Sequence, residues 1–373
     1  MGRRIAMVVA VVVLAAGMAI WSRQRDPEPV TPVKPAPLAP LPPLEQLRAA
    51  IQSEAAAQQN PWVLAHAMLA LGPDVQLGDR TARKALDGLL RRDDNGPYFD
   101  LMDAQGGLGE VHPHLVLKVL SDVAATDPLC QELLHRAIAT FRRPNRFENW
   151  NDSAWFLEAL HRLGVAKTQP LGTSGDTVAT LFAGAHQQLL YAQRVVEALL
   201  QQPEFRRPQG NVPVDVGGVW SYTCGGQHLL QAQLLAARYA GTTERAQLLS
   251  VLQTFGQRLD AEYSFRVAER TRAVQSGVNP NSALLQTALS LLKLLGHALE
   301  TLAYARDAGI GDPAKLEQQA HQTRARLLGV LEELTAKSDL RQLFPGARKR
   351  APKDWLLWFG DGCHALHGLR LWE

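Results

Sequence analysis

Apolar residues recur at intervals of three and four from residue 44 onward, and this spacing constrains the fold more than any other feature of the sequence. The run Leu284, Leu285, Ala288, Leu291, Leu292 and Leu295 is one example. Such spacing places apolar side chains on one face of an α-helix. Alternating strand patterns are scarce, so the sequence predicts an all-α body over residues 44–373.

Several of the predicted helices share one form. Each begins at a polar, Pro or Gly turn, usually near a tryptophan, then runs through a Leu- and Ala-rich stretch to a glycine. Examples begin near Trp62, Trp150, Trp220, Asn279 and Trp355. Asn, Asp and Ser cap the first turn of a helix, and Gly suits its exit. The repeated form predicts stacked pairs of inner and outer helices closed into an α/α toroid; an open α-solenoid is the alternative.

Residues 5–21 form an uncharged apolar stretch between Arg3-Arg4 and Arg23, with Trp21 at its end. As a helix this stretch rises about 26 Å, close to the hydrocarbon thickness of a bilayer. It predicts a transmembrane helix within a signal anchor over residues 1–26. We expect a single pass through an inner membrane, with the amino terminus inside and the body periplasmic. A cleaved signal peptide is the alternative.

Eight prolines lie within residues 27–43, and this segment is predicted to be an extended linker. Five basic and two acidic residues fall in residues 1–43, whereas the rest of the chain carries 34 of each. Nucleic-acid affinity depends mainly on clustered Lys and Arg, so a neutral body argues against a nucleic-acid partner. The expected partners are the membrane, through residues 5–21, and an unidentified small molecule, glycan or envelope protein.

The chemically distinctive side chains lie near the starts of the predicted inner helices, which in a toroid open onto a central cavity. Cys224 and His228 are four residues apart, and Cys363 and His364 follow Asp361. Thiolate and imidazole are zinc ligands, and a catalytic zinc keeps three protein ligands and a water. The sequence therefore predicts Zn²⁺ held by Cys224, Cys363 and His364, with His228 and Asp361 as catalytic groups.

Other side chains are expected to line the same cavity. His66 faces the same way as Trp62 on its helix, and His297 and Glu300 are three residues apart on one helix face, where a carboxylate can orient an imidazole. For each histidine a purely structural role is the alternative. The predicted lining residues are Trp62, His66, Trp155, Trp220, Tyr222, Gln227, His297, Glu300 and His367.

The string Gly360-Asp361-Gly362-Cys363 resembles the Asp-x-Cys zinc motif in the β subunit of protein prenyltransferases. The adjacent pair Cys363-His364 is similar to the Cys-His pair of lanthionine-synthetase cyclase domains, which take a further cysteine from an earlier helix; here Cys224 has that place. Both families are α/α toroids. The resemblance implies a toroid with a zinc centre, acting as a transferase or cyclase, while a zinc-activated water would make it a hydrolase.

Two other hypotheses remain open. A non-catalytic envelope interaction protein would use these cysteines structurally, in the core or as a Cys224–Cys363 disulfide, which an oxidising periplasm permits. A carbohydrate-active enzyme would need two carboxylates beside aromatic rings. Asp152, between Trp150 and Trp155, and Asp361, after Trp358, are the pair of that kind.

Overall fold

The structure is a computed structural model that describes residues 41–373 apart from residue 59 and residues 102–111, 145–148 and 202–225. The compact unit within it runs from Pro42 to Glu373. The predicted transmembrane helix and most of the proline-rich linker lie outside the described residues. Among the described helices, only Pro280–Asp307 is long and apolar enough to cross a membrane by length and composition, and 61% of its most apolar window is buried.

The described chain is mostly helical, which confirms the all-α prediction. The helices are α2 (Pro43–Ala57), α3 (Pro61–Leu71), α4 (Ala82–Asp87), α5 (Leu115–Val123), α6 (Pro128–Thr140), α7 (Asn149–Arg162), α8 (Val178–Leu200), α10 (Gln227–Leu235), η2 (Ala236–Tyr239), α11 (Thr242–Gln275), α12 (Pro280–Asp307), α13 (Pro313–Thr335), α14 (Leu340–Arg350) and α15 (Pro352–Arg370). Three antiparallel hairpins connect them: β1 (Gln76–Leu77) with β2 (Arg80–Thr81), β3 (Arg91–Asp93) with β4 (Gly96–Tyr98), and β5 (Pro170–Leu171) with β6 (Asp176–Thr177).

The helix starts follow the capping chemistry in the sequence. Asn60 accepts a hydrogen bond from the backbone N–H of Val63, with Pro61 in the first turn of α3. Asn279 and Asp312 cap α12 and α13 in the same way, again followed by proline. A side-chain oxygen satisfies a backbone N–H that has no partner within the helix, and proline lacks that N–H altogether. These starts fix where each buried helix face begins.

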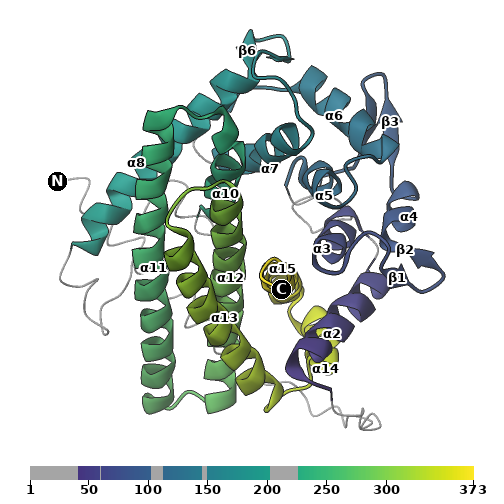
Figure 1. Ribbon diagram of the computed structural model, residues 1–373. Helices are drawn as coiled ribbons and strands as arrows, with labels where there is room; N and C mark the ends of the chain where they lie inside the picture. The colour runs from purple at the N-terminus through teal and green to yellow at the C-terminus, as the bar shows by residue number, and fades with distance from the viewer. Residues whose placement is uncertain (1–40, 59, 102–111, 145–148, 202–225) are drawn as a thin grey trace, which may run out of the picture. The chain divides into compact units, whose positions relative to one another are not determined.

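Six helices pack in a cycle. Along the chain, α3 packs on α5, α5 on α7, α7 on α10, α10 on α12 and α12 on α15, and α15 packs back on α3. In Figure 1, α15 is seen end-on between α12 and α3. Arg370 in the last turn of α15 donates to the carbonyl of Leu69 near the end of α3, at 3.1 Å. The cycle therefore joins helices from opposite ends of the described chain.

The remaining long helices cover this cycle. Helix α2 packs on α3 and α15 and also contacts α13 and α14, while α6 packs on α5, α8 on α7, and α11 and α13 on α12. Helices α3 and α10 are buried along almost their whole length. Helices that are apolar on most sides belong between neighbours rather than at a surface.

Glycines in α12 and α15 permit close packing rather than turns. The string from Gly360 to Cys363 lies inside α15, so the prediction that Cys363 stands near a helix start is wrong. A Cβ at Gly360 would lie 3.0 Å from the Trp62 ring, and one at Gly296 would lie 2.7 Å from the backbone nitrogen of Ala365. The missing Cβ lets α15 approach both α3 and α12, and this approach brings their polar side chains together.

Candidate metal centre

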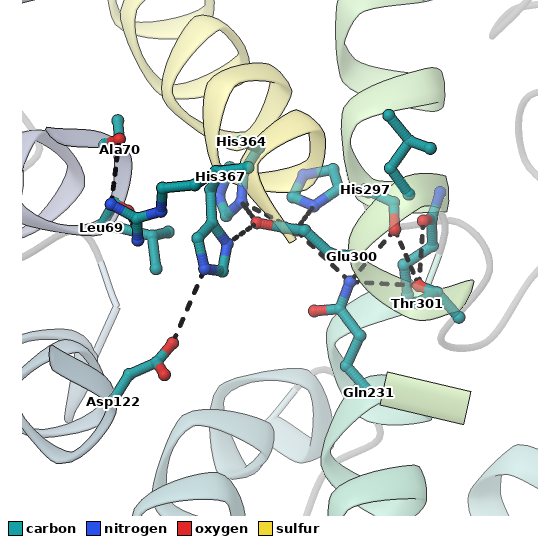
Figure 2. Close-up of polar contacts among 12 residues, drawn as sticks. Leu69, Ala70, Asp122, Gln231, His297, Glu300, Thr301, His364 and His367 are labelled. Atoms are coloured by element: carbon teal, nitrogen blue, oxygen red, sulfur yellow. Dashed lines mark hydrogen bonds and ion pairs between the residues drawn. The ribbon is translucent and has the colours of Figure 1, made fainter. Parts of the chain in front are cut away.

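Glu300 on α12 is the hub of a buried group of histidines. Its carboxylate accepts hydrogen bonds from Nδ1 of His297 at 3.1 Å, of His364 at 2.9 Å and of His367 at 2.6 Å. Figure 2 shows the carboxylate of Glu300 between His297 of its own helix and the two histidines of α15. Because a carboxylate only accepts, each Nδ1 carries the proton. The Nε2 atoms of His297 and His364 are thereby left as lone-pair donors.

His228 on α10 completes a set of three buried imidazoles with His297 and His364. One ring nitrogen from each lies within 4.8 Å of those from the other two, a spacing that can hold a metal ion. The His297 and His364 ring centroids are 4.0 Å apart, and that of His228 is 4.6 Å from that of His297. Nδ1 of His228 is buried and has no hydrogen-bond partner among the residues that the structure describes. Converging lone pairs cannot satisfy one another, whereas a cation satisfies all three.

The local electrostatics suits a cation. Burial lowers the pKa of His228 and of His364 well below the usual value, so both rings are neutral near pH 7. Burial acts to raise the pKa of Glu300, but the interaction with His364 and the histidine hydrogen bonds outweigh burial and hold that pKa well below its usual range. The centre therefore combines the neutral rings of His228 and His364 with one buried negative charge. Histidine must be neutral to bind a metal, and an outer carboxylate fixes the ring and raises its basicity.

A second set of hydrogen bonds links α10 to the segment of α12 around Glu300. Gln231, one helical turn after His228, donates to the carbonyl of His297 at 3.2 Å and to the hydroxyl of Thr301 at 3.1 Å. It also lies 3.4 Å from the Glu300 carboxylate, as Figure 2 shows. Gln227 accepts from Thr301 at 3.4 Å, which places this predicted lining residue beside the hub. Fixed neighbours of this kind keep metal ligands in place.

His66 and Trp62 lie beside the three imidazoles. Nδ1 of His66 donates to the backbone carbonyl of Trp62 at 2.8 Å, and the two rings are tilted by 43° with centroids 4.3 Å apart. The His66 ring also meets His364 edge-on at 5.4 Å. The structure therefore places Trp62 and His66 next to His364, while their lining of a central cavity stays a prediction.

Asp361 is a further buried acid on this side of α15, one turn before His364. Its carboxylate lies 3.6 Å from Nζ of Lys293. Burial raises the pKa of Asp361 to about 6, although Lys293 opposes the shift. The oxygen at this distance from Lys293, Oδ2, is buried and has no partner within hydrogen-bond distance among the described residues. An acid of this kind titrates close to neutral pH and is suited to proton transfer.

Of the two cysteines in the predicted ligand set, the structure describes only Cys363. Cys363 is fully buried, is a free thiol and, within the part of the chain that the structure describes, is not in the group that can hold a metal. Consecutive residues of a helix point about 100° apart, so Cys363 turns away from the hub when His364 faces it. Burial raises the pKa of Cys363 well above its usual value, which disfavours a thiolate. Cys224, Trp220 and Tyr222 lie outside the described residues.

A series of side-chain contacts connects Asp152, at a partly exposed position, to the imidazole of His228. Asp152 accepts from Nδ1 of His112 at 3.1 Å, and both side chains are about one-third exposed. The His112 ring stacks on the Trp155 ring with centroids 5.6 Å apart. The centroids of the Trp155 and His228 rings are 4.1 Å apart. Asp152 is thus a partner of histidine at a partly open position, while Asp361 is buried. A glycosidase pair of these two residues stays a prediction.

The structure also contains a buried ionic group near Glu300 that was not predicted from the sequence. Lys118 and Glu158 are both fully buried and 3.7 Å apart, and Arg162 pairs with Asp122 at 2.9 Å. Burial raises the pKa of Glu158 to about 7, with Lys118 opposing. Nε2 of His367 lies 3.8 Å from Asp122, which connects this group to Glu300. The spacings of four in Lys118–Asp122 and Glu158–Arg162 are the available signal, but such pairs usually mark an exposed helix face.

Comparison with known proteins adds no relative. No protein-family model, curated protein or solved structure matches this chain. The interpretation of the centre therefore rests on its own chemistry. Three imidazoles with an outer carboxylate are a ligand set for zinc or a similar transition metal, and three protein ligands leave a coordination position for water or substrate.

Proposed function

We propose that this protein is a metal-dependent enzyme whose centre is a divalent ion, foremost Zn²⁺, bound by His228, His297 and His364. The observation that supports the proposal is the convergence of three buried ring nitrogens within 4.8 Å, two of them on rings held by one carboxylate. Bound zinc lowers the pKa of a coordinated water and polarises a carbonyl or phosphoryl oxygen. Asp361, one turn before the ligand His364 on α15, is the candidate general acid or base of this reaction. The reaction class that fits best is metal-assisted hydrolysis or group transfer.

The ring of helices supplies the scaffold for this site. We infer an α/α toroid, and the return of α15 onto α3 supports it, because an open α-solenoid would leave its first and last helices apart. The ligands come from α10, α12 and α15 of the cycle. A site built across several rigid helices is held more precisely than one built on loops.

The proposed location is outside the cytoplasm, on a membrane anchor formed by residues 5–21. The apolar stretch and the prolines that follow it in the sequence support this proposal. Deleting residues 1–26 should move the protein from the membrane fraction to the soluble fraction. Recovery of the full chain in the soluble fraction without detergent would contradict the anchor.

Metal analysis of the purified full-length protein tests the proposed centre. We expect about one zinc per chain in the natural protein and less than a few tenths in His228→Ala, His297→Ala and His364→Ala. His321→Ala is the matched control, since the side chain of His321 is 70% exposed. Zinc at less than a few tenths per chain in the natural protein, purified without chelators, would overturn the proposal. The non-catalytic interaction hypothesis would then be favoured.

A further inference from the structure

His66 is the imidazole next to the metal centre that the proposed ligand set does not use. Its Nδ1 lies 2.8 Å from the backbone carbonyl of Trp62, which can only accept a hydrogen bond, so Nδ1 carries the proton. Nε2 of a neutral His66 is then a lone-pair acceptor. No hydrogen bond to this atom is found within the described part of the chain, and the side chain is buried.

The position of His66 fits a role beside the ligands rather than among them. Its ring meets His364 edge-on with centroids 5.4 Å apart, but it does not belong to the group of ring nitrogens within 4.8 Å of one another. A Cβ at Gly360, one turn before His364 on α15, would lie 3.8 Å from Cδ2 of His66. The Cδ2 atom of the ring, which adjoins Nε2, therefore faces α15 one turn before His364.

We propose that Nε2 of His66 accepts a hydrogen bond from the water that completes the coordination of the metal held by His228, His297 and His364. His66 is then a catalytic residue that orients this water, and the inference rests on the proposed function. A lone pair at this place accepts a hydrogen bond from bound water more strongly than from bound hydroxide, because water is the better donor. His66 therefore favours the protonated form while it orients the water, and the hydrogen bond to Trp62 fixes the ring.

The surroundings of His66 keep it an acceptor. Burial lowers the pKa of His66 to about 3, and nearby His112, Lys118 and His297 act in the same direction, while the hydrogen bond to Trp62 opposes them. The ring is therefore neutral across the physiological range. Asp361, on the facing helix α15, is the nearby acid whose titration has to be distinguished from that of the bound water.

Cobalt(II) substitution of the full-length protein tests this role without a known substrate. The visible absorption of bound Co²⁺ reports ionisation of its water, so its pH midpoint can be compared between the natural protein, His66→Phe and His66→Gln. We expect all three to bind one Co²⁺ per chain. In His66→Phe the midpoint should fall by about one pH unit, because the acceptor that favours bound water is lost, and His66→Gln, which keeps an acceptor near the position of Nε2, should restore part of the shift. Asp361→Asn, measured in parallel, identifies any midpoint that belongs to Asp361.

Each outcome decides the inference. An unchanged midpoint in cobalt-loaded His66→Phe would overturn it, and so would loss of Co²⁺ from that variant alone, since His66 would then be a ligand. If the natural protein binds no Co²⁺ or Zn²⁺, the proposed function itself fails. A measurement on the zinc-loaded natural protein needs no variant: ¹⁵N NMR of the histidine rings should show His66 with its proton on Nδ1 and with Nε2 free of metal. The opposite tautomer would also overturn the inference.

Discussion

Nδ1 of His364 lies 2.9 Å from the carboxylate of Glu300, although 64 residues separate the two in the sequence. The same carboxylate holds His297 and His367, so one buried charge sets the tautomer of three rings on two helices. A ligand set of this kind exists before any metal arrives. Its outer carboxylate should therefore affect metal affinity without touching the metal.

Replacing Glu300 by Gln should weaken zinc binding by about 10- to 100-fold. The amide keeps the shape of the side chain but removes the charge that holds Nδ1–H of His297 and His364. Competition with a chromogenic chelator measures the affinity. Glu317→Gln is the control, because the side chain of Glu317 is 69% exposed. Equal affinity in the Glu300 variant and the natural protein would show that Glu300 does not orient the ligands.

Stability and zinc binding should also depend on the close approach of α12 and α15. Gly296→Ala places a Cβ 2.7 Å from the Ala365 backbone nitrogen, so α15 must move away and take His364 with it. We expect a loss of about 1–3 kcal/mol in the free energy of unfolding, together with weaker zinc binding. Chemical denaturation and chelator competition measure the two effects.

Gly329→Ala on α13 is the matched control for this substitution. Nothing lies within 4 Å of a Cβ at Gly329, so alanine should be neutral or stabilise the helix by about 0.5–1 kcal/mol. If both glycine variants behave alike, close packing is not the reason for Gly296.

Lys118 and Glu158 should show strong coupling in a double-mutant cycle. Each is buried and each is the ionic partner of the other at 3.7 Å. Lys118→Met leaves an acid without its cation and should cost about 3–5 kcal/mol at pH 8. The cost should be smaller at pH 6, because the pKa of Glu158 is about 7 and the neutral acid needs no cation. The double variant Lys118→Met with Glu158→Gln should lose less than the sum of the two single variants. Additive losses would argue against a functional ion pair.

Acid should destabilise the metal-free protein through its buried histidines. The pKa of His66 is about 3 in the folded state and near 6.5 when unfolded, so between these values the unfolded chain binds one more proton. The free energy of unfolding then falls with decreasing pH by about 1.4 kcal/mol per pH unit for this residue. Asp361, whose folded pKa of about 6 lies above its unfolded value, acts in the opposite direction below pH 6.

Urea unfolding at several pH values between 4 and 7, with chelator present, measures this slope. His66→Phe removes one titrating ring, so its slope should be shallower than that of the natural protein by about 1.4 kcal/mol per pH unit. Identical slopes would mean that His66 takes up a proton in the folded state.

The all-α fold class, and the pairs of residues that lie one helical turn apart, could be predicted from the sequence. A spacing of three or four residues follows from the helix itself, so it predicted that Glu300 would face the same side as His297 and that His66 would lie with Trp62. Which helix packs against which depends on contacts between distant segments. The meeting of His228 with His364 across the cycle therefore had no signature in the local pattern.

Two features misled the sequence-based interpretation for physical reasons. The glycines that flank Asp361 predict a helix start in the sequence, but within α15 they make room for Trp62 and Leu47 of neighbouring helices. Charged residues such as Lys118 and Glu158 normally lie on the exposed face of a helix, and only the three-dimensional packing of α5 and α7 shows that they are buried.

The position of α15 after all the other contributing helices has a consequence for maturation. While the polypeptide is being synthesised, His228 and His297 emerge long before the segment that carries His364. An ion encountered at that stage meets flexible side chains with no common geometry. Any ion bound by the proposed centre would therefore be selected by the finished scaffold, in the compartment where α15 docks.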